Sequence, residues 1–321
     1  IIVIENQISK KNQSILLNMI DDFPNFSLRF INATRYLSNK KLHTALHVTV
    51  MTYLRLAMLD IMTHYHKAIY MDCDVVVNSD IAELYETNLN GYMIGAAIDT
   101  VMAGWCNTDG NEQKSYNRNV VGLKHEFEYF NAGNIIVNLD EFRNSYTSKQ
   151  LFEIAQSKSW KWFDQDVLNQ VCEGHVKFID NNWNVMSHWH DYDWQLPEYF
   201  APNSIYQNYK QALSAPKAIH FAGRTMPCYV PYVDLGNIFW KYARISPFYE
   251  QIIFMHTVIQ SDSRSGARKL ADKILPKGSR RRKVAKRILP KGSLRWRFCK
   301  QIYYIIRPKY RPIKVKDEDK E

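Results

Sequence analysis

Residues His66–Asp80 read HKAIYMDCDVVVNSD: an apolar run, then Asp72, Cys73 and Asp74, then a second apolar run. Short runs of β-branched and aromatic residues are typical of buried strands. The pattern therefore predicts that the two aspartates lie at a strand end or in the break between two strands. A carboxylate pair in such a place needs a cation or a proton to offset its charge. Because hard oxygen ligands favour Mg²⁺ or Mn²⁺, the stretch indicates a divalent metal site.

The chain has 321 residues, 46% of them hydrophobic and 13% aromatic. This is enough for one large α/β domain or two smaller ones. The net charge of +10 is unevenly distributed, because residues 264–316 contain 20 Lys and Arg and a single acid, Asp272. The part before them is therefore mildly acidic. Such asymmetry is typical of an electrostatic attachment segment and not of a uniformly basic protein.

The five cysteines are scattered and form no CxxC pair. This spacing argues against a disulfide framework or a zinc ribbon and favours a reducing compartment. No stretch approaches the roughly 18 consecutive apolar residues that span a bilayer. The sequence begins at Ile1 with a strand-like run, so we expect a further N-terminal segment to precede it.

The first residues predict a strand, a helix and a second strand. Residues 1–5 form the first strand, Ser9–Ile20 the helix with Ser9 at its N-cap, and Ser27–Ile31 the second strand. A βαβ unit implies a parallel sheet covered by helices. A further helix is predicted over Leu46–Met62.

Arg55 falls at the edge of the apolar stripe of that helix, four residues after Met51 and three before Met58. Such a side chain either extends its charged end to solvent or points toward an anionic ligand. The spacing leaves both interpretations open.

Asp80 is predicted to cap a short helix that ends at Tyr85, and Tyr92–Ile98 to form a strand that ends at Asp99. Residues Thr100–Glu128 are polar and show no clear period. Long irregular stretches inside compact domains are usually functional, so we expect a loop over a substrate here.

Phe130–Phe142 reads FNAGNIIVNLDEF and predicts a strongly apolar strand. Asn131, Ala132 and Gly133 lead into it. Small residues and an amide at this point favour close approach of a ligand to the backbone, and a plain turn is the alternative.

Three other polar sites each allow a structural and a functional interpretation. Asp164 begins a helix that runs through Val171, and its simplest role is that of an N-cap. His220 lies in the short strand Ala218–Phe221, where it is either a satisfied core residue or a metal ligand. Four polar residues lie between Trp183 and Trp194: His188, His190, Asp191 and Asp193. They could form a metal cluster, but hydrogen bonding and the stacking of a sugar on tryptophan are the favoured interpretation.

From Ser261 onward the composition changes to Ser, Gly, Lys and Arg, and ILPKGSR at Ile274 is repeated as ILPKGSL at Ile288. Apolar residues alternate with the basic ones. The segment is predicted to lie on anionic lipid with Trp296 at the interface. Nucleic acid is the alternative partner, because a basic run also binds phosphates non-specifically. The interleaved apolar residues favour lipid.

Together these motifs resemble glycosyltransferase family 8, retaining enzymes that include bacterial lipopolysaccharide α-galactosyl- and α-glucosyltransferases and glycogenin. Any one motif is unspecific, whereas an ordered set of six is specific. The matching segments occur in the family's order over about 220 residues: Tyr53–Leu56 (YLRL), Ala68–Asp74 (AIYMDCD), Gly95–Asp99 (GAAID), Phe130–Gly133 (FNAG), Asp164–Asn169 (DQDVLN) and His220–Gly223 (HFAG).

The resemblance implies a GT-A fold, an α/β fold with a Rossmann-like mixed sheet and flanking helices, over residues 1–260, followed by a basic amphipathic helical tail over 261–321. It places Asp72, Asp74 and His220 on a Mn²⁺ or Mg²⁺ ion that bridges the diphosphate of a UDP-sugar. The implied catalytic residues are Gln165, near the anomeric carbon, and Asp164. The implied donor-binding residues are Arg55, Asp72, Cys73, Asp74, Asp99, Asn131, Ala132, Gly133, Gly223 and Arg224.

Two departures from the family pattern affect donor binding. The family continues HxxGxxKPW, whereas this chain has HFAGRTMPC, so Met226 and Cys228 replace the lysine and the tryptophan. The lysine normally meets the diphosphate, and Arg224 is the implied substitute. The family's first strand and helix, with an aspartate-rich turn that recognises uracil, are expected before Ile1.

We therefore expect a metal-dependent retaining glycosyltransferase that moves glucose or galactose from UDP onto lipopolysaccharide or another glycan or glycolipid acceptor. The expected place is the cytoplasmic face of a bacterial membrane, with the tail (264–316) on its anionic surface and no specific nucleic acid bound. One alternative is a haloacid-dehalogenase-like phosphatase with Asp72 as nucleophile, although its usual residues after the DxD are replaced by valines. The other is a non-enzymatic protein that binds an anionic surface.

Overall fold

The computed structural model describes residues 1–44, 49–187, 197–223, 226–230 and 233–262. The chain divides into two compact units, and the first comprises Ile1–Trp189 and Gln195–Glu250. The described part of the second unit is the C-terminal portion of helix α12 (Tyr249–Asp262). The sheets and the site therefore belong to the first unit.

The N-terminal prediction of a strand, a helix and a strand is confirmed by β1 (Ile2–Glu5), α1 (Lys10–Asn18) and β2 (Arg29–Asn32). β1 and β2 pair in parallel, as expected for a βαβ unit. Ser9 caps α1 as predicted, because its Oγ accepts a hydrogen bond from the backbone N–H of Asn12 at 3.2 Å.

The helix predicted over Leu46–Met62 is wrong in type, because most of its described part is a 3-10 helix. This helix, η1, spans Val50–Ala57, and one turn of α-helix, α3 (Met58–Ile61), follows it. A 3-10 helix has about three residues per turn, so side chains at i and i+3 lie in line. Thr52 and Arg55 therefore project along the same line from η1.

The central sheet is mixed, as predicted, and has the order β3-β6-β5-β7. Its strands are β3 (Lys67–Met71), β6 (Phe130–Asn138), β5 (Ile94–Ile98) and β7 (Val176–Phe178). β6 is antiparallel to both β3 and β5, whereas β5 and β7 are parallel. All residues of β6 except its last are buried, which explains why its apolar residues Ile135–Val137 form a continuous run instead of alternating with polar ones.

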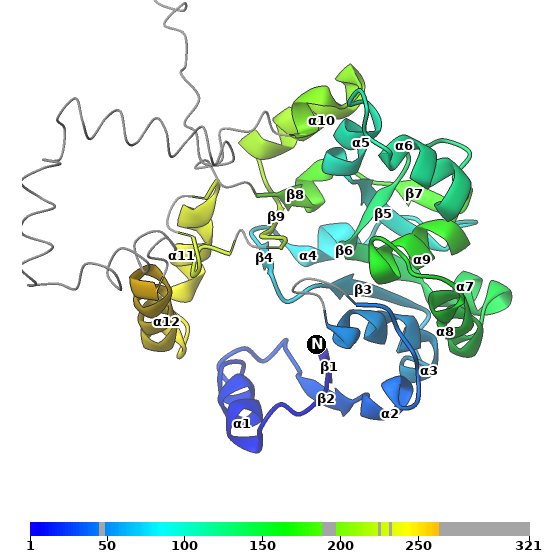
Figure 1. Cartoon of the computed structure of the whole chain (residues 1–321). Helices are drawn as coiled ribbons and strands as arrows, with labels where there is room; N and C mark the ends of the chain where they lie inside the picture. The colour runs from blue at the N-terminus through cyan, green and yellow to red at the C-terminus, as the bar shows by residue number, and fades with distance from the viewer. Residues whose placement is uncertain (45–48, 188–196, 224–225, 231–232, 263–321) are drawn as a thin grey trace, which may run out of the picture. The chain divides into compact units, whose positions relative to one another are not determined.

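A second sheet of three strands has the order β4-β9-β8 and consists of β4 (Val75–Val77), β9 (Ala218–His220) and β8 (Val185–Met186). The residues Asp72–Asp74 connect β3 of the central sheet to β4 of this one (Figure 1). The prediction of two carboxylates in a break between strands is therefore confirmed. The break lies where one sheet ends and the other begins.

Helices surround the two sheets (Figure 1). Side chains of η1, α8 and α9 pack with those of β5 and β6 in the largest hydrophobic cluster, which contains the fully buried Tyr53 and Trp160. Outside the segment 100–128, the other helices are α2 (Thr34–Leu37), α4 (Ile81–Tyr85), α7 (Leu139–Ser145), α8 (Ser148–Ser157), α9 (Phe163–Val171), η3 (Asn181–Trp183), η4 (Pro197–Phe200), α10 (Asn203–Ser214) and α11 (Gly236–Ala243).

The long irregular loop predicted over Thr100–Glu128 is wrong, because most of it is helical. It contains α5 (Thr100–Cys106), α6 (Gln113–Tyr116) and the π-helix η2 (Asn117–Val121). Each is too short to produce a recognisable period in the sequence. The segment has its own hydrophobic cluster, formed by Met102, Val121, Leu123 and Tyr129.

Within the described ranges, no helix combines the length and the apolar character needed to cross a membrane. Of the predicted basic tail, only Ser261 and Asp262, at the end of α12, are described. The remainder of that prediction lies outside the described residues, as do His188, His190, Asp191 and Asp193.

Candidate active site

The backbone of the DCD stretch is fixed from both sides. The N–H of Asp72 donates to the carbonyl of Gly133 on β6 at 2.8 Å, and the N–H of Phe221, after β9, donates to the carbonyl of Asp74 at 2.9 Å. Val75 lies opposite His220 in the β4–β9 register. The two sheets thus hold both aspartates near His220.

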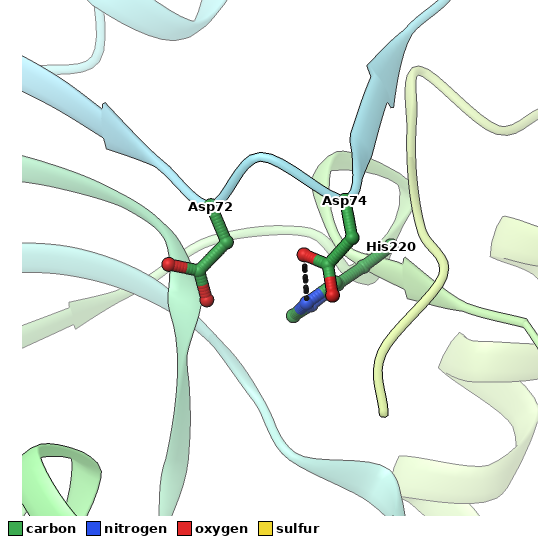
Figure 2. A group of neighbouring side chains, drawn as sticks. All are labelled: Asp72, Asp74 and His220. Atoms are coloured by element: carbon green, nitrogen blue, oxygen red, sulfur yellow. Dashed lines mark ion pairs between the residues drawn. The ribbon is translucent and has the colours of Figure 1, made fainter. Parts of the chain in front are cut away.

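Figure 2 shows the carboxylates of Asp72 and Asp74 on the same side of the connecting loop, with the His220 ring beside Asp74. One ligand atom from each of the three side chains lies within 4.8 Å of the others. His220 Nε2 and Asp74 Oδ1 are 3.2 Å apart. Adjacent ligand atoms on an octahedral Mg²⁺ ion, each about 2.1 Å from it, lie about 3.0 Å apart.

Asp74 Oδ1 is also buried without a hydrogen-bond donor among the described residues. A buried carboxylate oxygen in this state is costly unless a cation contacts it. The donor set of two carboxylates and an imidazole suits Mn²⁺ or Mg²⁺. The three residues predicted as metal ligands therefore fit a divalent ion.

Gly133 is required by the position of the His220 ring. A Cβ atom at residue 133 would lie 2.2 Å from His220 Cε1 and 2.9 Å from Nε2. Only glycine leaves room for the imidazole against β6. The group that approaches the backbone of the FNAG segment in the structure is the His220 side chain, and the approach of a ligand there stays a prediction.

Arg55 is buried at 5% exposure and lies between two carboxylates. Its Nη2 is 2.7 Å from Asp72 Oδ1, its Nε is 2.7 Å from Asp164 Oδ2, and its Nη1 donates to the carbonyl of Ala132 at 2.5 Å. The guanidinium also lies over the Tyr70 ring, 4.4 Å from its centroid. The interpretation of a solvent-exposed arginine is therefore wrong.

The charges around Arg55 and Asp164 are coupled. Burial lowers the pKa of Arg55, but Asp164 and Asp72 outweigh it, so the net pKa lies above its ordinary value. Burial raises the pKa of Asp164 to about 6, although Arg55 and the Thr52 hydroxyl favour its ionised form. The pair is charged at neutral pH, and Asp164 takes up a proton in mildly acidic conditions.

Asp164 is not an N-cap, because Trp162 occupies that position of α9 and Phe163 is the first helical residue. Phe163 has a φ of 55°, a left-handed conformation that is strained for a bulky residue. Asp164 Oδ1 accepts a hydrogen bond from Thr52 Oγ1 at 2.5 Å. Thr52 and Arg55, which are in line on η1, therefore contact the same carboxylate.

Gln165 and Asn131 converge on Asp99. Gln165 Oε1 accepts a hydrogen bond from the N–H of Ala132 at 2.9 Å, and its Nε2 donates to Asp99 Oδ2 at 3.4 Å. Asn131 Nδ2 donates to the same oxygen at 3.1 Å. Asp99 also caps α5 through the N–H of Met102 at 3.0 Å, and burial raises its pKa. The structure thus brings these predicted donor residues together.

Three predicted donor residues stand apart from this network. Cys73 is an exposed free thiol. Gly223 makes a left-handed turn after β9, with a φ of 70°. Arg224 lies outside the described residues. Met226, at the position of the family lysine, provides a carbonyl that accepts from the N–H of Tyr229 at 2.8 Å.

Sequence reasoning missed Thr52, Tyr70 and Asn184. Tyr70 Oη donates to Asp72 Oδ1 at 2.7 Å, and Asn184 contacts His220. Thr52 could have been found only by assuming 3-10 periodicity around Arg55.

Asp166 was also missed. It is fully buried and accepts hydrogen bonds from Tyr116 Oη, Tyr129 Oη and the N–H of Trp162 at 2.6 to 2.7 Å. It therefore fixes the start of α9. A cavity of about 140 Å³ elsewhere in the unit, lined by residues such as Glu128 and Glu173, contains none of the predicted site residues.

A comparison with protein families identifies the family of the chain. The family model described as glycosyl transferase family 8 matches residues 1–227, which is most of the chain. The chain belongs to glycosyl transferase family 8. The resemblance inferred from the six ordered motifs is thereby confirmed.

Curated relatives and solved structures agree with this membership. A Haemophilus influenzae protein named as a glycosyltransferase is 27% identical over 190 residues, 57% of this chain and 53% of that protein. The lipopolysaccharide 1,2-glucosyltransferase of Escherichia coli is 25% identical over 168 residues, 50% of this chain and 44% of the enzyme. This family-8 chain thus spans about half the length of these relatives.

Among solved structures, the bifunctional glycosyltransferase WbbM is 27% identical with a TM-score of 0.70, covering 79% of this chain and 45% of WbbM. The galactosyltransferase LgtC has a TM-score of 0.55 at 20% identity, covering 80% of this chain and 84% of LgtC. The likeness to LgtC shows a shared fold. The expected GT-A type of mixed α/β fold is therefore confirmed for the family-8 chain.

Replacing Gly133 by Ala tests the position of His220. The added methyl group would displace the imidazole, and we expect Mn²⁺ affinity to fall by about 10- to 100-fold, the range seen when support of a metal ligand is lost. The free Mn²⁺ signal in electron paramagnetic resonance measures this affinity. Gly95→Ala on β5 is the control, because its Cβ would meet only the side chains of Leu89 and Ile136. Equal Mn²⁺ affinity of Gly133→Ala and wild type would contradict the prediction.

Replacing Asp164 by Asn tests the charge coupling with Arg55. The folded chain binds the Asp164 proton more tightly than the unfolded chain, so the stabilising contribution of Asp164 is largest below about pH 4 and is lost as pH rises through 6. We expect the free energy of unfolding of wild type, relative to Asp164→Asn, to fall by about 2–3 kcal/mol between pH 4 and 7. Urea unfolding at a series of pH values measures it. A difference that does not vary with pH would show that burial does not raise this pKa.

Proposed function

We propose that this family-8 chain is a divalent-metal-dependent hexosyltransferase that moves glucose or galactose from a UDP-hexose onto a lipopolysaccharide or related glycan acceptor. The observation that carries the proposal is the cluster of Asp72, Asp74 and His220. In this cluster Asp74 Oδ1 is buried and accepts no hydrogen bond from the described residues. The acceptor class is supported by the names of relatives, which include a lipopolysaccharide 1,3-galactosyltransferase of Salmonella typhimurium that is 26% identical over 151 residues.

In this proposal Asp72, Asp74 and His220 hold Mn²⁺ or Mg²⁺. When bound, the ion acts as a Lewis acid that offsets the negative charge developing on the departing diphosphate. Arg55 pairs with the Asp72 carboxylate and orients it, because its Nη2 lies 2.7 Å from Oδ1. Tyr70 supports the same oxygen with a second hydrogen bond at 2.7 Å.

The donor sugar is proposed to lie against Asp99, Asn131, Asp164 and Gln165. The Gln165 carboxamide is held at both ends, by the N–H of Ala132 and by Asp99, so it is rigid before a donor arrives. Both oxygens of Asp164 are engaged, one by Thr52 and one by Arg55. This favours a positioning role for Asp164 over direct bond formation.

The two alternative functions lose their support. Membership of family 8 provides no basis for a phosphatase, and one oxygen of the Asp72 carboxylate, Oδ1, is occupied by Arg55 and Tyr70. A purely non-enzymatic role leaves the convergence of polar groups on Asp99 and Asp164 unexplained.

The function is tested by UDP release from UDP-glucose, UDP-galactose and UDP-N-acetylglucosamine, using the full-length protein with Mn²⁺ and then with EDTA. We expect release from one of the hexose donors that EDTA abolishes. Asp74→Asn should reduce the rate by at least about 100-fold, the loss typical when a transition-state charge stabiliser is removed. Asp80→Asn, which removes the charge of an exposed helix cap but keeps its accepting oxygen, is the matched control. If none of the donors gives UDP release that EDTA abolishes, the proposal is contradicted.

We further propose that residues 1–260 form the catalytic domain and 261–321 a tail that attaches it to an anionic membrane surface on the cytoplasmic side. Each basic residue near such a surface contributes about 1 kcal/mol. Liposome flotation should show binding that requires anionic lipid and is lost on deletion of residues 264–321. A nucleic-acid shift assay at the same salt is the comparison, and tighter binding there than to liposomes would overturn the lipid assignment.

A further inference from the structure

A line of hydrogen bonds runs from the backbone of β6 to the imidazole of His220. The N–H of Gly133 donates to Asn131 Oδ1 at 3.0 Å, and Asn184 Nδ2 is 2.9 Å from the same oxygen. Asn184 Oδ1 is 3.1 Å from His220 Nδ1. Asn131, Asn184 and His220 are all buried, at 7%, 3% and 4% exposure. Bulk water therefore has little access to these groups.

The direction of every bond in this line follows from its first member. A backbone N–H can only donate, so the Asn131 atom that faces Gly133 is the carbonyl oxygen. Asn131 Nδ2 then faces Asp99 Oδ2 at 3.1 Å, a carboxylate that can only accept when ionised. This second contact gives the same orientation independently.

The orientation of Asn131 sets that of Asn184. Since the Asn131 oxygen accepts, the Asn184 atom 2.9 Å from it must be the amide nitrogen. The Asn184 oxygen then faces His220 Nδ1. An oxygen of this kind can only accept, so Nδ1 must carry the proton.

With its proton on Nδ1, a neutral imidazole has a lone pair on Nε2. That nitrogen lies 3.2 Å from Asp74 Oδ1, which is buried and receives no hydrogen bond in the described part of the chain. Two lone pairs facing each other at this distance repel unless a cation lies between them. The opposite tautomer would instead place an Nε2–H against Asp74 and block the nitrogen as a ligand.

We propose that Asn184 is a positioning residue that holds the proton of His220 on Nδ1 and so keeps Nε2 available to a divalent cation. The inference rests on the metal site of the proposed function. Asn184 reaches the ion only through His220, and it ties that ligand to Asn131 and thus to the backbone at Gly133. A metal-ligating histidine commonly has its orientation and basicity set by a partner of its other nitrogen.

Two substitutions separate this role from a purely structural one. Asn184→Leu keeps the branched shape of the side chain but removes the acceptor for Nδ1–H. Asn184→Asp keeps an acceptor for Nδ1–H, replaces the donor to Asn131 by a carboxylate oxygen and adds a negative charge. Asn181→Leu is the control, because Asn181 is a buried amide whose contacts are the carbonyl of Ile98 and the hydroxyl of Thr100.

The proton position is measured by long-range ¹H–¹⁵N correlation spectra of protein labelled with ¹⁵N-histidine, with His220→Gln identifying the resonances of residue 220. We expect a proton on Nδ1 in wild type and in Asn184→Asp, and its transfer to Nε2 in Asn184→Leu. A wild-type His220 without a proton on Nδ1 would overturn the inference.

Mn²⁺ affinity is measured on the same proteins by electron paramagnetic resonance. We expect Asn184→Leu to lose about 10- to 100-fold, while Asn184→Asp and Asn181→Leu stay close to wild type. Equal losses in both Asn184 variants would identify a structural role and overturn the inference. A wild type that binds Mn²⁺ and releases UDP, with Asn184→Leu unchanged, would overturn this inference alone. A wild type that binds no Mn²⁺ would overturn it together with the proposed function.

Discussion

The buried guanidinium of Arg55 is the interaction on which the rest of the site depends. It is the group that offsets the charge of both Asp72 and Asp164, each 2.7 Å away. Breaking a buried pair of this kind costs about 3–5 kcal/mol, because the remaining charge has no partner. The 3-10 helix η1 makes the arrangement possible, since it aligns Thr52 with Arg55 toward one carboxylate. A helix, a strand end and the start of α9 are thereby tied together.

The other acidic groups of the site are stabilised in different ways. Asp99 is stabilised by the amides of Asn131 and Gln165 and by the N-terminus of α5. Asp74 receives no comparable support at Oδ1, where it faces a histidine nitrogen instead. Donors within the chain thus satisfy one carboxylate and leave an oxygen of the other to an external cation. This difference distinguishes Asp74 from Asp99, whereas Asp72, the other proposed ligand, has its Oδ1 paired with Arg55 and Tyr70.

The features of the fold that depend on neighbouring residues could be predicted from the sequence. The apolar run of β6, the break at the DCD stretch and the capping serine of α1 all follow from residues that are neighbours in the chain. Side-chain contacts between residues far apart in the sequence could not be predicted from it. Thr52 and Asp164 are 112 residues apart, so neither the burial of Arg55 nor the contacts of Asp164 could be deduced from periodicity or capping rules.

Short elements were the second source of error. The segment 100–128 folds into three helices of four to seven residues, each shorter than the window in which a period can be recognised. Their stability comes from tertiary packing around Met102 and Tyr129 and not from an amphipathic pattern. The expectation of an irregular loop failed because an absence of period was taken as an absence of structure.

The replacement of the family lysine by Met226 removes a positive charge that Arg55 does not replace. Met226 brings no charge to a diphosphate, and the charge of Arg55 is already matched by two carboxylates at 5% exposure. Neither residue can therefore offset much of the charge that develops on a departing nucleotide. In the proposed function that charge is left to the divalent ion held by Asp72, Asp74 and His220 and to Arg224, the implied substitute for the lysine, so the orientation of His220 by Asn184 matters for it.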